Sequence, residues 1–236
     1  MNLKDITPAI FLKNEEYWVH YVLRDLLAVF DRVIMLDTGS EDATKDIACK
    51  TAEHINGKFT LIEQHFGDDP HKIGDCPNIL RNEVNTFWMM LLAGDEILRT
   101  EQLLKLQDIE LDTKKYLVGM ILGYNVREDN GVIKSGDTFA ADKFFAPDIK
   151  WTSTEYPFEG YGQHQLAEQG LVNYMPREFY YWHVRHLKRS RLDDSTYFRI
   201  IKKDYYPYNG PYTDLPTNWI GDIASYPNPY FDGLLK

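Results

Sequence analysis

Apolar runs and polar clusters alternate through the first hundred residues in a way that predicts strands and helices in turn. Four apolar runs have the length of strands, and the one that follows Arg32 is apolar at every position, which is typical of a strand covered on both faces. The four runs are Ile6–Leu12, Val33–Leu36, Phe59–Ile62 and Phe87–Leu92. Strands that alternate with helices predict a parallel sheet joined by right-handed crossovers.

Apolar residues at helical spacing lie between these runs. They predict helices over residues 18–29, 43–55 and 79–86. We expect Asn14 and Ser40 to be the N-cap residues of the first two helices, because short polar side chains accept hydrogen bonds from free helical N–H groups. Asn56 and Gly57 are expected to end the second helix.

The second half of the chain has a different pattern. A helix is expected over Thr100–Gln107 and a strand over Tyr116–Val126, followed by a hairpin turn at Asn130–Gly131. Mixed strands and aromatic residues come next, and a closing helix is expected over Leu192–Tyr206. The remaining residues are rich in Tyr, Pro, Asn and Gly.

Length and charge narrow the classes of protein to consider. The chain has 236 residues, the size of one large domain, and its formal net charge is -10. Such an acidic chain repels nucleic acid phosphates, so we expect no nucleic acid partner. The two cysteines, Cys49 and Cys76, form neither a disulfide framework nor a zinc motif. No apolar stretch approaches the roughly 20 residues of a membrane span, and a cytoplasmic protein is expected.

Polar clusters follow the apolar runs at the points where the predicted strands end. They are Lys13–Glu15, Asp37–Asp42 and Asp95–Glu96. In parallel sheets, ligands bind beyond the carboxyl ends of the strands. Carboxylates at that edge suit a hard divalent cation, Mn²⁺ or Mg²⁺.

Each cluster also has a simpler interpretation. Asp37 can cap a helix, and Asp95 with Glu96 can form a solvated turn. The tetrapeptide Asp37–Ser40 also matches the active-site sequence of aspartic proteases, but that chemistry needs two such aspartates and the chain has one copy.

Several separated segments together resemble family 2 glycosyltransferases. They are Ala9–Glu15, Val33–Thr44, Arg81–Asn82 and Trp88–Glu96. The resemblance is specific over residues 6–98, becomes loose to about residue 190 and does not cover the tail. It implies the α/β GT-A fold, with a Rossmann-like, mostly parallel central sheet flanked by helices and a smaller mixed sheet on the acceptor side.

The resemblance also implies a division of the chain and an activity. One domain, 1–236, would contain a nucleotide-sugar-binding half at 1–98, an acceptor half at 99–191 and a C-terminal extension at 192–236. The implied activity is the metal-dependent transfer of a sugar, with inversion, from a nucleotide diphosphate donor to an acceptor hydroxyl. A UDP-sugar is the favoured donor and a glycan is one acceptor class. A nucleotide- or glycan-binding domain without activity is the alternative, and the oligomeric state stays open.

In the first half, the resemblance implies roles for individual residues. Asp37 would bind the base or ribose, Asp95 would bind the metal, and Arg81 would approach the nucleotide. Ala93 stands where the family has the first aspartate of its metal motif, so Glu96 is a candidate to assist. The other residues assigned to the donor pocket are Leu12, Lys13, Asn14, Glu15, Ser40 and Gly94.

In the second half, the resemblance is looser. An inverting transfer needs a carboxylate that takes the acceptor proton. Glu155 is the first candidate for this base, and Glu159 and Asp142 are alternatives. The basic segment His183–Arg191 suits the released diphosphate.

Within this basic segment, Lys188 and Arg191 are the candidate phosphate ligands. The resemblance also implies a late histidine in the metal site, and His183 is preferred to His186 as that ligand. The polar segment from His65 to Cys76 lacks regular ligand spacing and is expected to be a loop beside the donor pocket.

Overall fold

The protein is described by a computed structural model that carries no ligands. The description covers residues 1–67, 70–110, 112–113, 115–129, 132–151, 166, 168–176, 178–184, 190–192 and 229–230. Glu155, Glu159, Lys188 and His186, as well as nearly all of the closing helix expected over 192–206, lie outside these residues.

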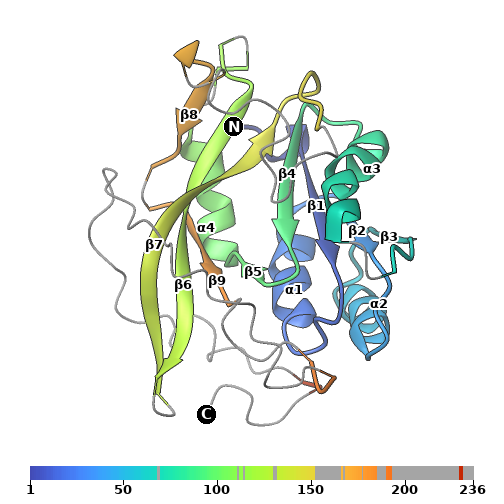
Figure 1. The fold of residues 1–236 in the computed structure, drawn as a ribbon. Coiled ribbons are helices and arrows are strands. Elements are labelled where there is room, and N and C mark those ends of the chain that lie inside the picture. The colour runs from blue at the N-terminus through green and yellow to red at the C-terminus, as the bar shows by residue number, and fades with distance from the viewer. Residues whose placement is uncertain are drawn as a thin grey trace.

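The first half forms the alternating strands and helices that the apolar pattern predicts (Figure 1). The strands are β1 (Ile6–Leu12), β2 (Val33–Asp37), β3 (Phe59–Glu63) and β4 (Trp88–Ala93). The helices are α1 (Val19–Val29), α2 (Thr44–Ile55) and α3 (Cys76–Glu83), with short 3-10 helices η1 (Leu3–Asp5) and η2 (Pro70–Asp75). Helix α3 therefore begins earlier than predicted, because η2 leads directly into it.

Both N-cap predictions are wrong. Trp18 precedes α1, and Asn14 has a left-handed backbone with φ 55°. Helix α2 starts at Thr44, whose backbone N–H donates to the Asp42 carboxylate, while Ser40 lies farther upstream. The end of α2 is as expected, since the left-handed Asn56 closes it.

The strand order places the ends of β1 and β4 at a topological switch point. β1, β2, β3 and β4 pair in parallel in the order β3-β2-β1-β4. The chain thus moves outward from β1 to β3 and then returns to the other side of β1. At such a point the crossovers run on opposite faces, which leaves a crevice beyond the carboxyl ends of the two central strands.

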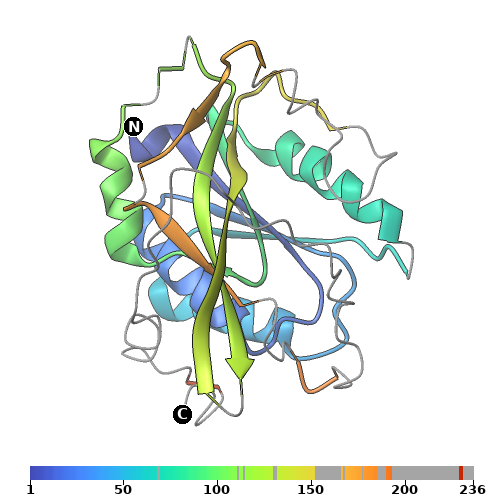
Figure 2. The ribbon, with the colours of Figure 1, turned by 60° about the vertical axis from the view of Figure 1, so that its left-hand side comes forward.

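The helices cover the two faces of this sheet in the way the switch point requires (Figure 2). Residues of α1 and α2 pack with Ile10 and Met35 in one buried cluster. Leu80 of α3 packs with Ile34 and Leu91 in the other. β1, β2 and β4 are buried on both faces, which explains their apolar runs, whereas β3 at the sheet edge is half-buried. Among the described helices, none combines the length and apolarity that crossing a bilayer requires.

The second half extends the same sheet with mixed strands. These are β5 (Glu96–Ile97), β6 (Val118–Asp129), β7 (Val132–Phe145), β8 (Val172–Tyr174) and β9 (Tyr180–His183), and α4 (Thr100–Leu104) and η3 (Lys105–Asp108) lie between β5 and β6. β6 and β7 form a long antiparallel hairpin whose pairing reaches Asp129 and Val132, next to the turn predicted at 130–131. The predicted fold class, a mostly parallel sheet with a mixed extension, is confirmed.

The sheet curls strongly between β4 and β5. Only two residues separate the end of β4 from the start of β5, yet β7, β6 and β9 lie between these two strands in the sheet. A connection this short is possible only if the β5 edge returns to the carboxyl end of β4. The curl therefore brings β9 and β5 to the edge at which the parallel strands end.

Candidate functional site

Gly94 sets the distance between the end of β4 and the loop after β1. Its N–H donates to the carbonyl of Phe11 at 3.1 Å. A Cβ atom at this position would lie 2.5 Å from Leu12 Cβ and 2.7 Å from Glu15 Cγ. Only glycine fits there without a shift of the loop, so the residue type itself brings Asp95 close to β1.

The loop after β1 is locked to the loop after β2. The N–H of Asn14 donates to Ser40 Oγ at 2.8 Å, and Asn14 Oδ1 accepts the N–H of Glu41 at 2.9 Å. The N–H of Glu15 donates to Thr44 Oγ1 at 2.8 Å. The loops that carry Asn14, Glu15 and Ser40 are thus brought together, and Lys13 Nζ reaches the carbonyl of Gly67 at 3.5 Å.

Asp37 has a structural contact on one oxygen and a buried second oxygen. Its Oδ1 accepts the N–H groups of Gly39 at 2.9 Å and Ser40 at 2.7 Å. Its Oδ2 is buried and has no hydrogen-bond partner in the part of the chain that the structure describes. Oδ1 therefore shapes the turn after β2 and does not cap α2, which starts at Thr44, while Oδ2 can accept a further hydrogen bond.

The turn after Asp37 is shaped by Gly39. Its φ of 112° suits glycine, and the ring of His65 lies against it, so that a Cβ atom would meet His65 Cδ2 at 2.8 Å. His65 thus packs on the Asp37 turn.

Among the described residues, no three His, Cys, Asp or Glu side chains are grouped as a metal site.

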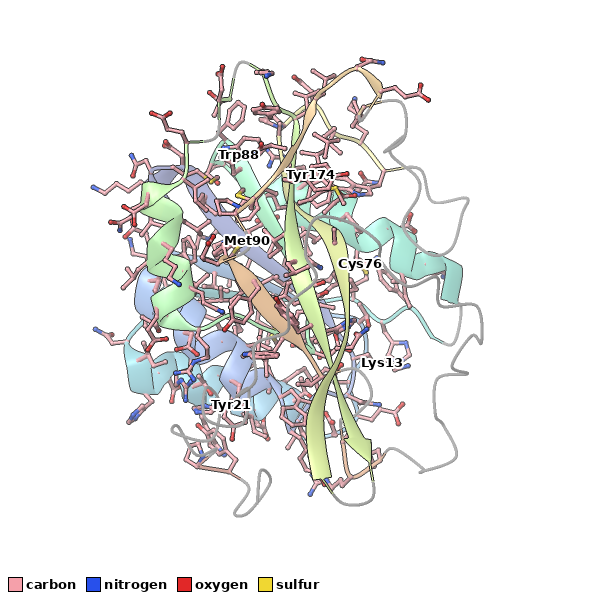
Figure 3. The ribbon with its side chains drawn as sticks, turned by 90° about the vertical axis from the view of Figure 1, so that its left-hand side faces the viewer. Lys13, Tyr21, Cys76, Trp88, Met90 and Tyr174 are labelled. Carbon is pink, nitrogen blue, oxygen red and sulfur yellow. The ribbon has the colours of Figure 1, made fainter. Side chains whose placement is uncertain are left out.

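Asp95 and His183 meet at the carboxyl edge of the sheet. Asp95 Oδ1 lies 3.5 Å from His183 Nε2, and the N–H of Val184 donates to the Asp95 carbonyl at 2.9 Å. Figure 3 shows Trp88, at the start of β4, and Lys13, after the end of β1, at opposite ends of the sheet. The two residues assigned to the metal are therefore neighbours at the end of the sheet where Lys13 lies.

The separation of this pair suits a shared cation. Two ligands about 2.1 Å from one octahedral ion are about 3 Å apart when adjacent and about 4.2 Å apart when opposite. The 3.5 Å between Asp95 Oδ1 and His183 Nε2 is about 0.5 Å longer than the adjacent separation, so a shift of that size would let both atoms bind one ion. A carboxylate and an imidazole together form a donor set that binds divalent metals.

Glu96, which was expected to assist the metal, is instead held by other groups. Both of its oxygens lie 2.6 Å from Lys143 Nζ, and Oε2 also accepts the N–H of Ala93 at 2.8 Å. The ammonium of Lys143 also lies 5.0 Å from the centre of the Tyr181 ring. Because Lys143 neutralises Glu96, this carboxylate is not available as a metal ligand in the structure.

Arg191 is fixed beside the loop after β1 by a carboxylate that the sequence did not identify. Glu16 is completely buried and accepts the Arg191 N–H at 2.6 Å and the Ser190 hydroxyl at 3.2 Å. Arg191 Nε lies 3.4 Å from the same carboxylate, and the Arg191 side chain is 62% exposed. The structure thus brings Arg191 to the edge where the donor is expected.

Arg81 lies at the other end of the sheet. Its Nη2 donates to the carbonyl of Thr86 at 3.4 Å, just before β4 begins. Burial lowers the pKa of its guanidinium, and Asp148 partly opposes this shift. The structure therefore does not place Arg81 with Asp37 and Asp95.

Sequence reasoning missed three polar residues of this region, namely Glu16, Asn125 and Lys143. Each was a polar interruption in or beside a strongly apolar stretch, and that was the available signal. Their partners come from distant segments, so the sequence alone did not indicate what they contact.

Asp142, the alternative base, lies among the described residues. Burial raises its pKa to about 7, and Lys143 opposes the shift.

Comparison with known proteins identifies the fold but not a family. No family model matches the chain, and no curated protein matches its sequence. The structure of S. aureus TarS is similar over 76% of this chain and 36% of that chain, with TM-score 0.55 and 15% identity. The mannosyltransferase PcManGT from Pyrobaculum calidifontis, in complex with GDP-Man and Mn²⁺, is similar over 76% of this chain and 56% of that chain, with TM-score 0.55 and 11% identity.

The chain has the GT-A fold. A shorter TarS structure in complex with UDP-GlcNAc is also similar, with TM-score 0.50 and 13% identity over 78% of this chain and 60% of that chain. The chain therefore spans less than two thirds of each of these solved chains. The GT-A fold also contradicts the aspartic protease alternative, because Asp37 ends a parallel strand that leads into a helix.

Proposed function

We propose that the protein is a glycosyltransferase that moves a sugar from a nucleotide diphosphate donor to an acceptor hydroxyl. The observation that carries this proposal is the pairing of Asp95 with His183 at the switch-point edge of a GT-A fold. The solved structures with this fold include one bound to UDP-GlcNAc and one bound to GDP-Man with Mn²⁺. A UDP-sugar remains the favoured donor.

In this proposal each described residue has a definite part. Asp37 Oδ2 accepts a hydrogen bond from the base or ribose, and the interlocked loops of Asn14 and Ser40 form the floor beside it. Asp95 and His183 hold a divalent cation, Mn²⁺ rather than Mg²⁺ because imidazole is not among the oxygen ligands that Mg²⁺ prefers. When bound, the cation offsets the charge of the departing diphosphate. Arg191 supplies further positive charge, and so would Lys188, which lies outside the described residues.

The proposed reaction is an inverting displacement. The acceptor oxygen forms a bond to the anomeric carbon of the donor sugar while the bond from that carbon to the diphosphate oxygen breaks. A carboxylate takes the acceptor proton, and the nucleoside diphosphate leaves with the bonding electron pair. We assign the base to Glu155, which lies outside the described residues. Asp142 is the described alternative, since its pKa of about 7 suits a general base near neutral pH. Residues 1–98 would form most of the donor site, and 99–191 would bind the acceptor and add His183 and Arg191 to the donor's diphosphate.

The test is a panel of nucleotide sugars with and without Mn²⁺, followed by donor binding and by transfer or hydrolysis of the sugar. We expect Asp95→Ala to abolish metal-dependent UDP binding. Glu155→Gln should keep donor binding and lower the transfer rate at least about 100-fold, as expected when a general base is lost. Absence of both binding and turnover with every donor would contradict the proposal, whereas binding without turnover would indicate a non-catalytic domain.

A further inference from the structure

Asn125 lies in one row with His183 and Glu96 across three strands. In the pairing of β6 with β9, Asn125 is the direct partner of His183, and in the pairing of β9 with β5, His183 is the direct partner of Glu96. Direct partners on adjacent strands project from the same face of a sheet, about 5 Å apart. Asn125 and His183 are therefore side by side on the face that also carries Glu96.

The amide of Asn125 is buried without a hydrogen bond. The residue is 0% exposed, and neither Oδ1 nor Nδ2 has a hydrogen-bond partner in the described part of the structure. A buried amide without partners destabilises the fold, and native proteins rarely keep one that nothing satisfies. Asn78 shows the ordinary arrangement: its Nδ2 donates to the Trp151 carbonyl at 2.8 Å and its Oδ1 accepts the Trp151 N–H at 3.2 Å.

We propose that Asn125 is the third side chain of the cation site formed by Asp95 and His183. This inference rests on the proposed function. Amide carbonyl oxygens are normal ligands of hard divalent ions, so Asn125 Oδ1 binds the cation and its Nδ2 donates to a diphosphate oxygen of the donor. The His183 side chain is 12% exposed, which leaves an approach for the ion on that side of the row.

The metal supplies a test that does not depend on turnover. Mn²⁺ binding to the full chain is measured by electron paramagnetic resonance, alone and with UDP, for the wild type and for Asn125→Leu. Leucine has nearly the same shape but no polar atoms. We expect about tenfold weaker Mn²⁺ affinity, the loss typical when a group that tunes a metal site is removed. The thermal midpoint without metal should stay equal or rise, because a buried amide without partners has been removed.

Two further variants make the result specific. Asn125→Asp keeps the ligand oxygen and adds a negative charge, so it should bind Mn²⁺ at least as tightly as the wild type, and it serves if Asn125→Leu does not fold. Asn78→Leu is the matched control. It should lower the thermal midpoint, since it leaves the Trp151 backbone groups unpaired, and leave Mn²⁺ affinity unchanged.

The outcomes separate this inference from the proposed function. If the wild type binds Mn²⁺ and Asn125→Leu binds it equally well, Asn125 is not part of the site and a bound water or local packing accounts for it. Weaker binding by both Asn125→Leu and Asn125→Asp would likewise overturn the ligand role. If the wild type binds no Mn²⁺ with or without UDP, the cation site of the proposed function fails as well.

Discussion

At the scale of single residues, Asp142 shows how burial couples stability to pH. Burial raises its pKa to about 7 despite the adjacent ammonium of Lys143, and its Oδ1 is buried without a hydrogen-bond partner among the described residues. The folded protein therefore holds a proton at pH values at which the unfolded chain has released it. The stability that this proton provides is complete below the unfolded pKa and is lost as pH rises to about 7.

We predict that Asp142→Asn makes the protein less sensitive to pH between about 4 and 7. The wild type should lose stability across this interval, since folding then requires proton uptake or a buried charge. The variant should be close to the wild type near pH 4 and more stable than it at pH 8. Urea denaturation at each pH measures the difference, with the exposed Asp108→Asn as the control. Parallel pH curves for Asp142→Asn and the wild type would contradict the assignment.

At the scale of elements, the buried ion pair between Lys143 and Glu96 stabilises the curl of the sheet, and we call this pair the brace. Lys143 comes from β7 and Glu96 from β5, two strands that are not neighbours in the sheet. The pairing of β6 with β7 is irregular between Gly119 and Met120, and Lys143 is the additional residue on β7. This bulge re-aims the Lys143 side chain toward Glu96. Since Glu96 follows Asp95, the brace also fixes the turn that carries the proposed metal ligand.

We predict a large coupling between these two residues. Lys143→Met leaves the Glu96 carboxylate buried without its counter-charge, which should lower the free energy of unfolding by about 3–5 kcal/mol. Adding Glu96→Gln to Lys143→Met should recover part of that loss, because the unpaired charge is then gone. Urea denaturation of both single variants and the double variant gives the coupling energy.

The exposed pair Lys45 and Glu63 is the matched control, with Nζ and Oε2 2.7 Å apart. Lys45→Met should have little effect, since exposed ion pairs contribute little to stability. Equal, small effects at Lys45 and Lys143 would show that the buried pair is not a brace.

At the scale of the whole molecule, Glu16 connects the loop after β1 to residues 190 and 191, far along the chain. It accepts hydrogen bonds from Ser190 and from Arg191, at a sequence separation of 174 and 175 residues, and also from the Ala43 N–H. One buried carboxylate thereby joins the loop after β1, the start of α2 and the basic segment. The position of Arg191 at the proposed donor site depends on this contact.

We predict that Glu16→Gln loosens the segment around Arg191 without unfolding the domain. Loss of the charged acceptor weakens hydrogen bonds worth about 1.5–3 kcal/mol, so local opening should become at least about tenfold more frequent. Trypsin cleavage after Arg191, followed by mass spectrometry of the fragment 1–191, reports this opening. The exposed Glu63→Gln is the control. Unchanged cleavage at Arg191 in the Glu16 variant would show that other contacts hold this segment.

The sequence by itself determined the parallel half of the fold and the end of the sheet at which the proposed site lies. Apolar runs predicted β1, β2 and β4 because strands covered on both faces need few polar positions, and the half-buried β3 followed from its own short apolar run. The ends of the runs in β2 and β4 located Asp37 and Asp95. It failed at the helix starts, where Asn14 and Ser40 bind each other's loops instead of free helical N–H groups. Local rules do not include such a competing partner from another segment.

Only the tertiary structure decided which distant residues meet. The curl of the sheet brings His183 to Asp95 and Lys143 to Glu96. The pairing of β6 with β9 places Asn125 beside His183, and α3 holds Arg81 near the start of β4, at the other end of the sheet. The pairing of β9 with β5 and the bulge in β7 fix these contacts, and neither leaves a periodic signal in the chain. Hydrophobic spacing encodes which face of an element is buried, whereas the partners of a buried charge are set by packing between elements.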